Sequence, residues 1–348
     1  MDRNVHSSQQ LDLEAALAAA RRPLENRAMP PAGLRIRVKT SPALRRLLPT
    51  EIVLRRATAR ARASWDKSPA ERERALRAME AVVGGTGREG ELEELARRFL
   101  VEDAAHHALF WQPWETASME ADSRARLEDA VTQGRGVILS ACHMGPIFLY
   151  MSAISSRDQV AKDRVVYIVS APWFLEQPSH DYWGRRLARW WQGLQGRNER
   201  MIFRPGASRV MSALLEEGQI VLNYFDMPGN RPTRLLGKSV MLAGSTARIA
   251  AATDALVLPV RARRDGRHAW ADVGQALDAR DFDGTEDLHD ALAAAHERWM
   301  LELPATVEDP TRPGSWGESL TAGEQAQPEP AGAAPSVFDQ GPSGGPPV

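Results

Sequence analysis

Short apolar runs alternate with helical patterns through the second and final thirds of the chain. Each run is rich in β-branched or other apolar residues and is bounded by turn residues. The strands predicted in this way cover residues 137–141, 165–170, 201–203, 220–225 and 256–260. The helices between them are expected at 145–156, 180–194, 206–217 and 244–253. This alternation predicts an α/β fold with a largely parallel central sheet and helices on both faces.

The first third of the chain has a helical pattern instead. Ser68, Pro69 and Glu71 form a capping box that opens a helix running to Val83. Further helices are predicted at about 89–111 and 123–133. After the strand at 256–260, residues 261–273 predict an antiparallel hairpin at the edge of the sheet. A last helix at about 285–303 returns over the sheet.

The two ends of the sequence have a different composition. Residues 1–33 carry four Pro or Gly residues and little periodicity, which indicates a mobile arm with one short helix. Residues 317–348 are rich in Pro, Gly and Ala and are expected to form a disordered tail. Between them, residues 34–316 are expected to form a single domain.

Composition narrows the functional classes. The net charge of −1 argues against a general nucleic-acid binder. The single cysteine, Cys142, excludes an intramolecular disulfide and a multi-cysteine zinc site, and the eight histidines lack ligand spacing, so no metal is expected. No stretch approaches the roughly 20 apolar residues of a membrane span. A cytoplasmic protein is expected. If it acts on lipids, it does so from the inner face of the cell membrane.

Two stretches have the composition of a docking surface. Residues 34–62 hold nine Lys or Arg and one acid among apolar residues, which suits an anionic lipid, the acidic face of a carrier protein, or a helix with a solvated basic face. In the helix predicted at 180–194, three Trp and two Leu residues gather on one face and three Arg on the other. This pattern suits either a membrane interface or a helix packed on the sheet.

Three candidate functional residues follow predicted strands. His143 follows the strand at 137–141, Arg204 follows 201–203 and Asp226 follows 220–225. The carboxyl ends of parallel strands share one edge, so a base, a cation and a carboxylate converge there. Such a set suits transfer of an acyl or phosphoryl group to a hydroxyl. The alternatives are an ion pair for Arg204 and a turn cap for Asp226.

These residues also carry a family resemblance. The segments SACHMG, MIFRPGASRVMSALLEEGQIVLNYFDMPG and LLGKSVMLAGSTARIAAATDALVLPV resemble the lipid A late acyltransferase and phosphatidylinositol mannoside acyltransferase group of the lysophospholipid acyltransferase superfamily, over about residues 97–316. The resemblance implies transfer of a fatty acyl chain from acyl carrier protein or acyl-CoA to a hydroxyl of a glycolipid, with no cofactor.

The resemblance also implies roles for individual residues. His143 would be the base, while Arg204 and Asp226 match the family's arginine and aspartate. Gly237, Gly244 and Ser245 fall in the segment that shapes the donor and acceptor site. From the residues alone, capping of the helix at 244–253 is the favoured role of Gly244 and Ser245.

The sequence departs from the family pattern at Phe148, which stands where the family has the acid that orients the catalytic histidine. No Asp or Glu occurs between His143 and Arg157. Three outcomes stay open: Asp226 substitutes for the acid, the backbone orients His143, or the site is inactive. Phe148 would then belong to an apolar groove for the acyl chain, together with Ile147 and Leu149.

Two functional hypotheses follow. The first is an acyltransferase with His143 as general base and a lipid or glycolipid hydroxyl or amine as acceptor. The second is a non-catalytic lipid or acyl-carrier binding protein that has lost the acid. A hydrolase has less support because the chain lacks a Gly-x-Ser-x-Gly elbow. The N-terminal membrane helix usual in the lipid A branch of the family is also missing here, which favours a soluble or peripheral enzyme.

Overall fold

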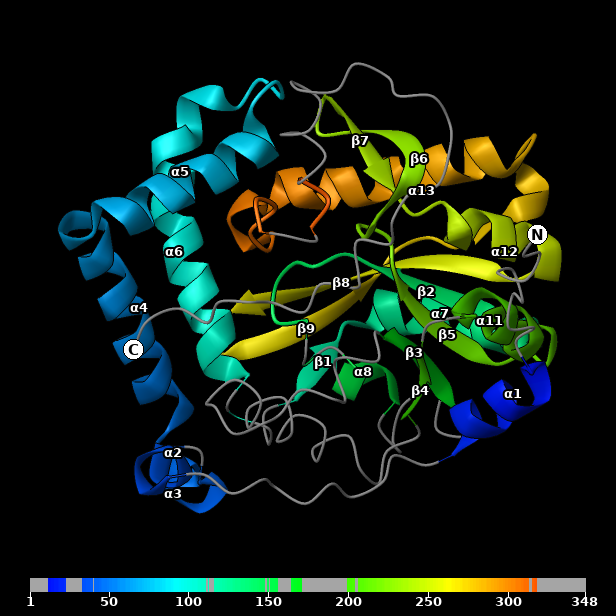
Figure 1. The fold of residues 1–348 in the computed structure, drawn as a ribbon, viewed down its shortest axis with the longest axis horizontal. Coiled ribbons are helices and arrows are strands. Elements are labelled where there is room, and N and C mark those ends of the chain that lie inside the picture. The colour runs from blue at the N-terminus through cyan, green and yellow to red at the C-terminus, as the bar shows by residue number, and fades with distance from the viewer. Residues whose placement is uncertain are drawn as a thin grey trace, which may run out of the picture.

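A central sheet organises the molecule (Figure 1). The computed structural model describes residues 12–22, 33–39, 41–110, 112, 116–147, 149, 151–155, 164–170, 199–203, 206–312 and 315–317. In these residues the strand order is β1-β9-β8-β2-β5-β3-β4, with β10 paired to β8. The strands are β1 (Ala117–Met119), β2 (Val137–Ala141), β3 (Val166–Ser170), β4 (Glu199–Phe203), β5 (Ile220–Tyr224), β8 (Leu256–Asp265), β9 (His268–Val273) and β10 (Leu277–Asp278).

The sheet is mixed but mostly parallel, as predicted. Strands β8, β2, β5, β3 and β4 all run parallel to one another. Strands β8 and β9 form the expected antiparallel hairpin. Its predicted place at the edge is wrong, because β1 pairs in parallel outside β9. With only three residues, β1 is too short to show a period in the sequence.

Burial on both faces explains the continuous apolar run of β2. All five of its residues are buried. Ile138 packs into the core cluster on one face, whereas Val137 and Leu139 pack into the cluster on the other. A strand covered on both faces carries apolar side chains on both, so its sequence does not alternate. The one polar residue of β2, Ser140, is paired with His296.

Helices supply both layers around the sheet. The first cluster draws on α1 (Leu13–Arg21), α5 (Pro69–Val83), α11 (Ala207–Glu216), α12 (Ser245–Thr253) and α13 (Thr285–Glu302). The second cluster draws on α7 (Ala121–Thr132) and α8 (Met151–Ser155).

Helix α8 begins later than the helix predicted from about residue 145, because residues 144–147 and 149 form a bridge and turns.

The helical N-terminal region stands beside the sheet as a group of helices (Figure 1). It contains α2 (Leu34–Lys39), α3 (Pro42–Arg46), α4 (Thr50–Lys67), α5 and α6 (Leu92–Leu109). The predicted cap of α5 is confirmed: Ser68 Oγ accepts a hydrogen bond of 3.4 Å from the Glu71 N–H, with Pro69 in the first turn. Helix α4 packs along α6, and both also contact the main core.

A second, two-stranded sheet was not predicted. Strands β6 (Pro228–Leu235) and β7 (Lys238–Leu242) form an antiparallel hairpin that packs on α13. Its tight turn places Leu236 and Gly237 at φ values of 55° and 72°. A turn with both central residues at positive φ matches the twist of a hairpin, but a leucine there gives no turn signal in the sequence.

No described helix combines the length and the apolar character needed to cross a bilayer. The helix predicted at 180–194 and the tail predicted at 317–348 lie outside the described residues, except for Gly317. The limits of the arm, domain and tail stay predictions.

Candidate active site

His143 and Asp226 form a hydrogen-bonded pair at the carboxyl edge of the sheet. His143 Nδ1 lies 2.8 Å from Asp226 Oδ1. The two residues meet because β2 and β5 are adjacent parallel strands and each residue lies just beyond the end of its own strand. The convergence predicted for these two residues is therefore confirmed as an arrangement in space.

The carboxylate also holds the backbone of the turn. Asp226 Oδ2 accepts a second hydrogen bond of 2.8 Å from the His143 backbone N–H. The Asp226 side chain is 1% exposed and the His143 side chain 29%. Asp226 is therefore a buried support that fixes the position of the His143 ring, and it does not cap the turn at 226–229 that was its alternative role.

Charge on the pair shifts both pKa values. Burial by itself lowers the pKa of His143, but the Asp226 carboxylate outweighs burial and raises it to about 9. Burial by itself raises the pKa of Asp226, and the His143 imidazolium with its hydrogen bonds outweighs that effect and lowers it. The resting pair is thus an imidazolium beside a carboxylate at neutral pH.

The turn that carries His143 is held in place by a segment near residue 306. Glu308 N–H donates to the His143 carbonyl over 2.7 Å, and Gly145 N–H donates to the Thr306 carbonyl over 2.8 Å. Met144 and Val307 form an antiparallel bridge between these bonds. Residues 306–308 thus act as a backbone strap, and this name is kept below.

Gly145 is required by this packing. Its φ is 65°, and a Cβ at this position would lie 2.0 Å from the Ala262 carbonyl oxygen. Any other residue would combine the left-handed conformation with a backbone clash.

Cys142, the residue before His143, is buried, as its predicted packing role requires. Burial raises the pKa of its thiol, so it is not a nucleophile.

An aromatic side chain lies against the His143 ring. The Tyr224 ring stacks on it with a centroid separation of 4.1 Å and an interplanar angle of 20°. Tyr224 is the last residue of β5, two positions before Asp226. The end of β5 therefore supplies both contacts of the imidazole: Asp226 bonds to a nitrogen at its edge, and Tyr224 stacks on its face.

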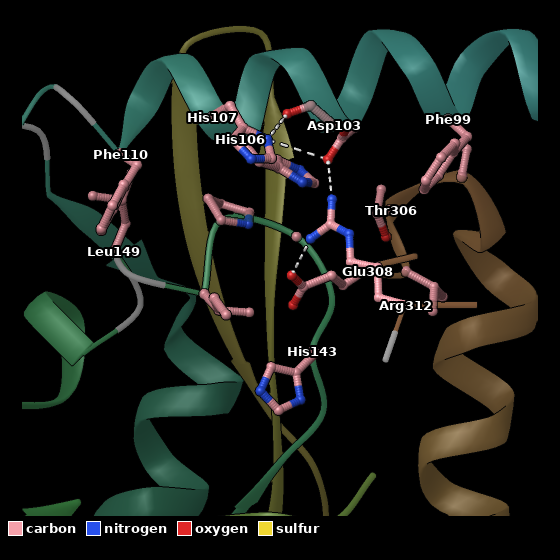
Figure 2. Close-up of a pocket in the computed structure, with 15 residues that line it drawn as sticks. Phe99, Asp103, His106, His107, Phe110, His143, Leu149, Thr306, Glu308 and Arg312 are labelled. Carbon is pink, nitrogen blue, oxygen red and sulfur yellow. Dashed lines mark hydrogen bonds and ion pairs between the residues drawn. The ribbon is translucent and has the colours of Figure 1, made fainter. Parts of the chain in front are cut away.

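His143 opens into a pocket of ≈ 130 Å³ between α6, the His143 turn and the strap (Figure 2). The wall includes apolar side chains from Phe99, Phe110, Ile147, Leu149 and Val307. The polar lining comes from Asp103, His106, His107, Glu308 and Arg312. In Figure 2 the polar group lies across the pocket from His143.

The polar lining is an ion-pair network. Arg312 Nη1 lies 2.7 Å from Glu308 Oε1, and its Nη2 lies 3.7 Å from Asp103 Oδ1. Arg74 contacts the other oxygen of Asp103 at 3.3 Å. Burial raises the pKa of Asp103, but His107 and the two arginines outweigh this and lower it well below its usual range. The guanidinium of Arg312 is therefore already neutralised by carboxylates.

No family model matches this chain, and no curated protein does. A solved structure does. The crystal structure of the 1-acyl-sn-glycerophosphate (LPA) acyltransferase PlsC from Thermotoga maritima is similar at 15% identity and a TM-score of 0.34, covering 70% of this chain and 98% of that one. A likeness of this size says nothing of the site's chemistry, which follows from its own geometry.

Two further histidines lie beneath the site and do not line the pocket. His296 Nε2 lies 3.1 Å from Ser140 Oγ, and His289 Nε2 lies 2.8 Å from Thr233 Oγ1. Phe225 packs between the two rings, at 5.1 and 5.2 Å. Burial lowers the pKa of each to about 4. They are neutral core residues on α13.

The other predicted site residues are dispersed. Gly237 lies in the β6–β7 turn and lines a separate hollow of ≈ 500 Å³. Gly244 precedes α12, and Ser245 is its first residue. None of the three lines the His143 pocket, so their part in substrate binding stays a prediction. Arg204 and Phe148 lie outside the described residues. Strand β4, which Arg204 follows, is separated from β5 by β3.

The sequence reasoning missed the polar lining of the pocket. Asp103 and His107 come from α6, and Glu308 and Arg312 come from the chain after α13. These positions are about two hundred residues apart in the sequence, and neither segment carries a motif. The described residues hold no group of His, Cys, Asp and Glu arranged as a metal site.

Proposed function

We propose that this chain is an acyltransferase that moves a fatty acyl group from an acyl thioester to a hydroxyl or amine of a lipid or glycolipid. The observation that carries the proposal is the 2.8 Å contact between His143 Nδ1 and Asp226 Oδ1 at the mouth of a partly apolar pocket. This contact supports Asp226 as the substitute for the acid that is absent at Phe148, because it brings a buried carboxylate from the neighbouring strand to the His143 ring.

The pair supplies a general base. In the neutral form of His143, with Nδ1 bonded to Asp226, Nε2 is the nitrogen left to take a proton from the acceptor. The acceptor oxygen or nitrogen attacks the thioester carbonyl carbon as its proton moves to Nε2. The carbon–sulfur bond then breaks, and His143 returns the proton to the departing thiolate. The products are an ester or amide and a free thiol.

The pocket limits what lies next to His143. A volume of ≈ 130 Å³ is close to that of a cavity that holds benzene, about 150 Å³. It therefore accommodates the reacting end of a substrate and a few methylenes, with the remainder of the acyl chain outside it. Ile147 and Leu149, which the sequence assigned to the acyl groove, both line it.

The remaining assignments belong to the same proposal. Arg204 would bind an anionic part of the donor or acceptor, and Phe148 would extend the apolar wall. Gly237, Gly244 and Ser245 would shape the outer part of the site. The donor is acyl carrier protein or acyl-CoA, and the work is done at the cytoplasmic face of a membrane. The resemblance in sequence motifs supports these roles.

The test is thioester turnover by the purified full chain. A panel of acyl-CoA and acyl carrier protein donors is offered with a total lipid extract, and release of free thiol and labelled lipid is followed. His143→Ala is expected to lower turnover by about 10²–10⁴-fold, the usual contribution of a general base. His268→Ala, at an exposed position of β9, is the matched control and should match the wild type.

The rival function gives a different result. Equal background turnover in the wild type and His143→Ala, with acyl-donor or lipid binding retained in both, would show a binding protein that keeps the pair without using it. That outcome contradicts the proposal.

A further inference from the structure

Exposed apolar side chains are concentrated in one short part of the chain. Of the six large apolar side chains exposed in the described residues, five lie between residues 34 and 48: Leu34, Val38, Leu44, Leu47 and Leu48. Leu34 is 77% exposed and Leu47 76%. Single exposed leucines are common on protein surfaces, but a cluster is typical of an interaction site.

The fold gathers these side chains into one projecting unit. Helices α2 and α3 pack against each other beside the N-terminal end of α4, away from the central sheet (Figure 1). Leu34 and Val38 are four residues apart on α2 and so lie on one helical face. Residues 34–48 are called the α2–α3 patch below.

Positive charge surrounds the α2–α3 patch. Arg35 and Arg37 are exposed within it, and Arg55 and Arg56 are exposed on the first turns of α4. The only acid between residues 34 and 62 is Glu51, which is paired with Arg267 from the β8–β9 turn. Leucines amid arginines with no free carboxylate suit a partner that offers both apolar volume and negative charge.

We propose that the α2–α3 patch is a docking surface for an anionic lipid bilayer. The leucines enter the boundary between headgroups and acyl chains, and the arginines lie at the lipid phosphates. An acidic protein partner would satisfy the arginines, but it would not require two leucines that are three-quarters exposed. A bilayer satisfies both groups of side chains together.

The location of the patch links it to the candidate site. Leu54, one turn into α4, shares a core cluster with Ala105 and Leu109 at the end of α6. The same end of α6 leads to Phe110, which lines the His143 pocket. The α2–α3 patch therefore lies at the end of α6 that borders the pocket. The docking proposal itself rests only on the patch and stands apart from the proposed function.

Vesicle co-sedimentation of the full chain tests it without measuring catalysis. Vesicles of phosphatidylcholine alone are compared with vesicles containing about 30% phosphatidylglycerol, at about 0.1 M and about 0.5 M salt. The wild type is expected to bind the anionic vesicles, and more weakly at high salt. The double variant Leu34→Ser with Leu47→Ser should lose about tenfold or more in partitioning at both salt concentrations.

A charge variant tests the second component. Arg35→Gln with Arg37→Gln should weaken binding about fivefold per arginine at low salt and much less at high salt. The matched controls are Met241→Ser, a large exposed apolar residue outside the patch, and Arg209→Gln on the exposed face of α11. Both should bind as the wild type does. Circular dichroism checks that each variant is folded. If the serine variant does not fold, the charge variant still tests the proposal.

Three results would overturn the proposal. Unchanged vesicle binding by both double variants would show that the α2–α3 patch does not touch lipid. A loss of binding to an acidic acyl carrier protein, with vesicle binding intact, would assign the patch to a protein partner. A shift from dimer to monomer in the serine variant, with vesicle binding intact, would assign it to a second copy of this chain.

Discussion

His143 and His296 both lie near the Asp226 carboxylate, yet their pKa values shift in opposite directions. The pKa of His143 is raised to about 9, because the charge and the hydrogen bond of Asp226 outweigh burial. The pKa of His296 is lowered to about 4, because burial dominates and Asp226 offsets only part of it. One ring is a cation at neutral pH and the other is neutral.

The difference comes from the direct partner of each ring. His143 is bonded to a carboxylate and is 29% exposed on its side chain. His296 is fully buried and bonded to a neutral hydroxyl, that of Ser140. A histidine is suited to acid–base chemistry when it has both a charged hydrogen-bond partner and access to solvent. It serves as a packed core residue when both are absent.

Among the changes that test this comparison, removing the Asp226 carboxylate should have the largest effect on turnover. Asp226→Asn keeps the shape of the pair but removes the charge that orients the ring and stabilises its protonated form. We expect acyl transfer to fall by about 10²–10³-fold, measured as thioester turnover. Asp129→Asn, on the exposed face of α7, is the control. Wild-type turnover by Asp226→Asn would show that Asp226 is only structural.

Removing the buried histidine should affect stability and not rate. In His296→Leu the hydroxyl of Ser140 loses its partner, which costs about 1–3 kcal/mol in the free energy of unfolding. Denaturant titration measures this, and adding Ser140→Ala should recover most of the loss. We expect turnover within about threefold of the wild type, since His296 does not line the pocket. A large loss of turnover in a folded variant would contradict the comparison.

The two rings should also titrate apart. Proton NMR of the histidine ring signals should show one group titrating near pH 9 that is missing in His143→Ala, and two near pH 4, of which one is missing in His296→Leu. Turnover requires neutral His143, so it should rise with pH and level off above about 9. A group titrating near its ordinary pKa of about 6.5 at either position would contradict the assignment.

Stability should follow the same shifts with opposite signs. A raised folded-state pKa stabilises the protein below the unfolded pKa, so the contribution of His143 is lost as pH rises from about 6.5 to 9. A lowered folded-state pKa stabilises the protein above the unfolded pKa, so the contribution of His296 is lost as pH falls from about 6.5 to 4. Thermal unfolding of the two single variants across this range separates the contributions.

The smallest expected effect concerns the stacked ring. Tyr224→Leu removes the aromatic face against His143, a contact of about 0.5–1.5 kcal/mol. Turnover should fall about threefold to tenfold. Tyr224→Phe keeps the stacking and is expected to retain turnover. If both variants lost turnover equally, the tyrosine hydroxyl and not its stacking would be the important group.

The sequence allowed prediction of those features that depend on local pattern. The apolar run of β2, the capped α5 and the alternation after residue 137 each follow from composition at neighbouring positions. The meeting of His143 and Asp226 followed from one rule, that parallel strands share a carboxyl edge. That rule does not give strand order, so it could not say that β2 and β5 are adjacent or that β3 separates β4 from β5.

The features that were missed depend on distant contacts. The β6–β7 hairpin turns at Leu236, whose positive φ is stabilised by burial and not by turn chemistry. The helix expected from residue 145 starts only at Met151, because the strap bonds the backbone of residues 143–145 first. Arg312 and Glu308 join the pocket through the same distant segment. Tertiary packing decides each case, and no local pattern records it.

The strap also sets an order for how the molecule is made. Every strand of the central sheet among the described residues precedes it in the chain, and so do His143 and Asp226. On a ribosome the sheet and the pair can therefore assemble while residues 306–308 are still inside the exit tunnel, with the His143 turn held from one side only. The nascent protein would acquire its finished pocket in a late, separate step, and emergence of those three residues from the tunnel would mark the moment at which the pocket is complete.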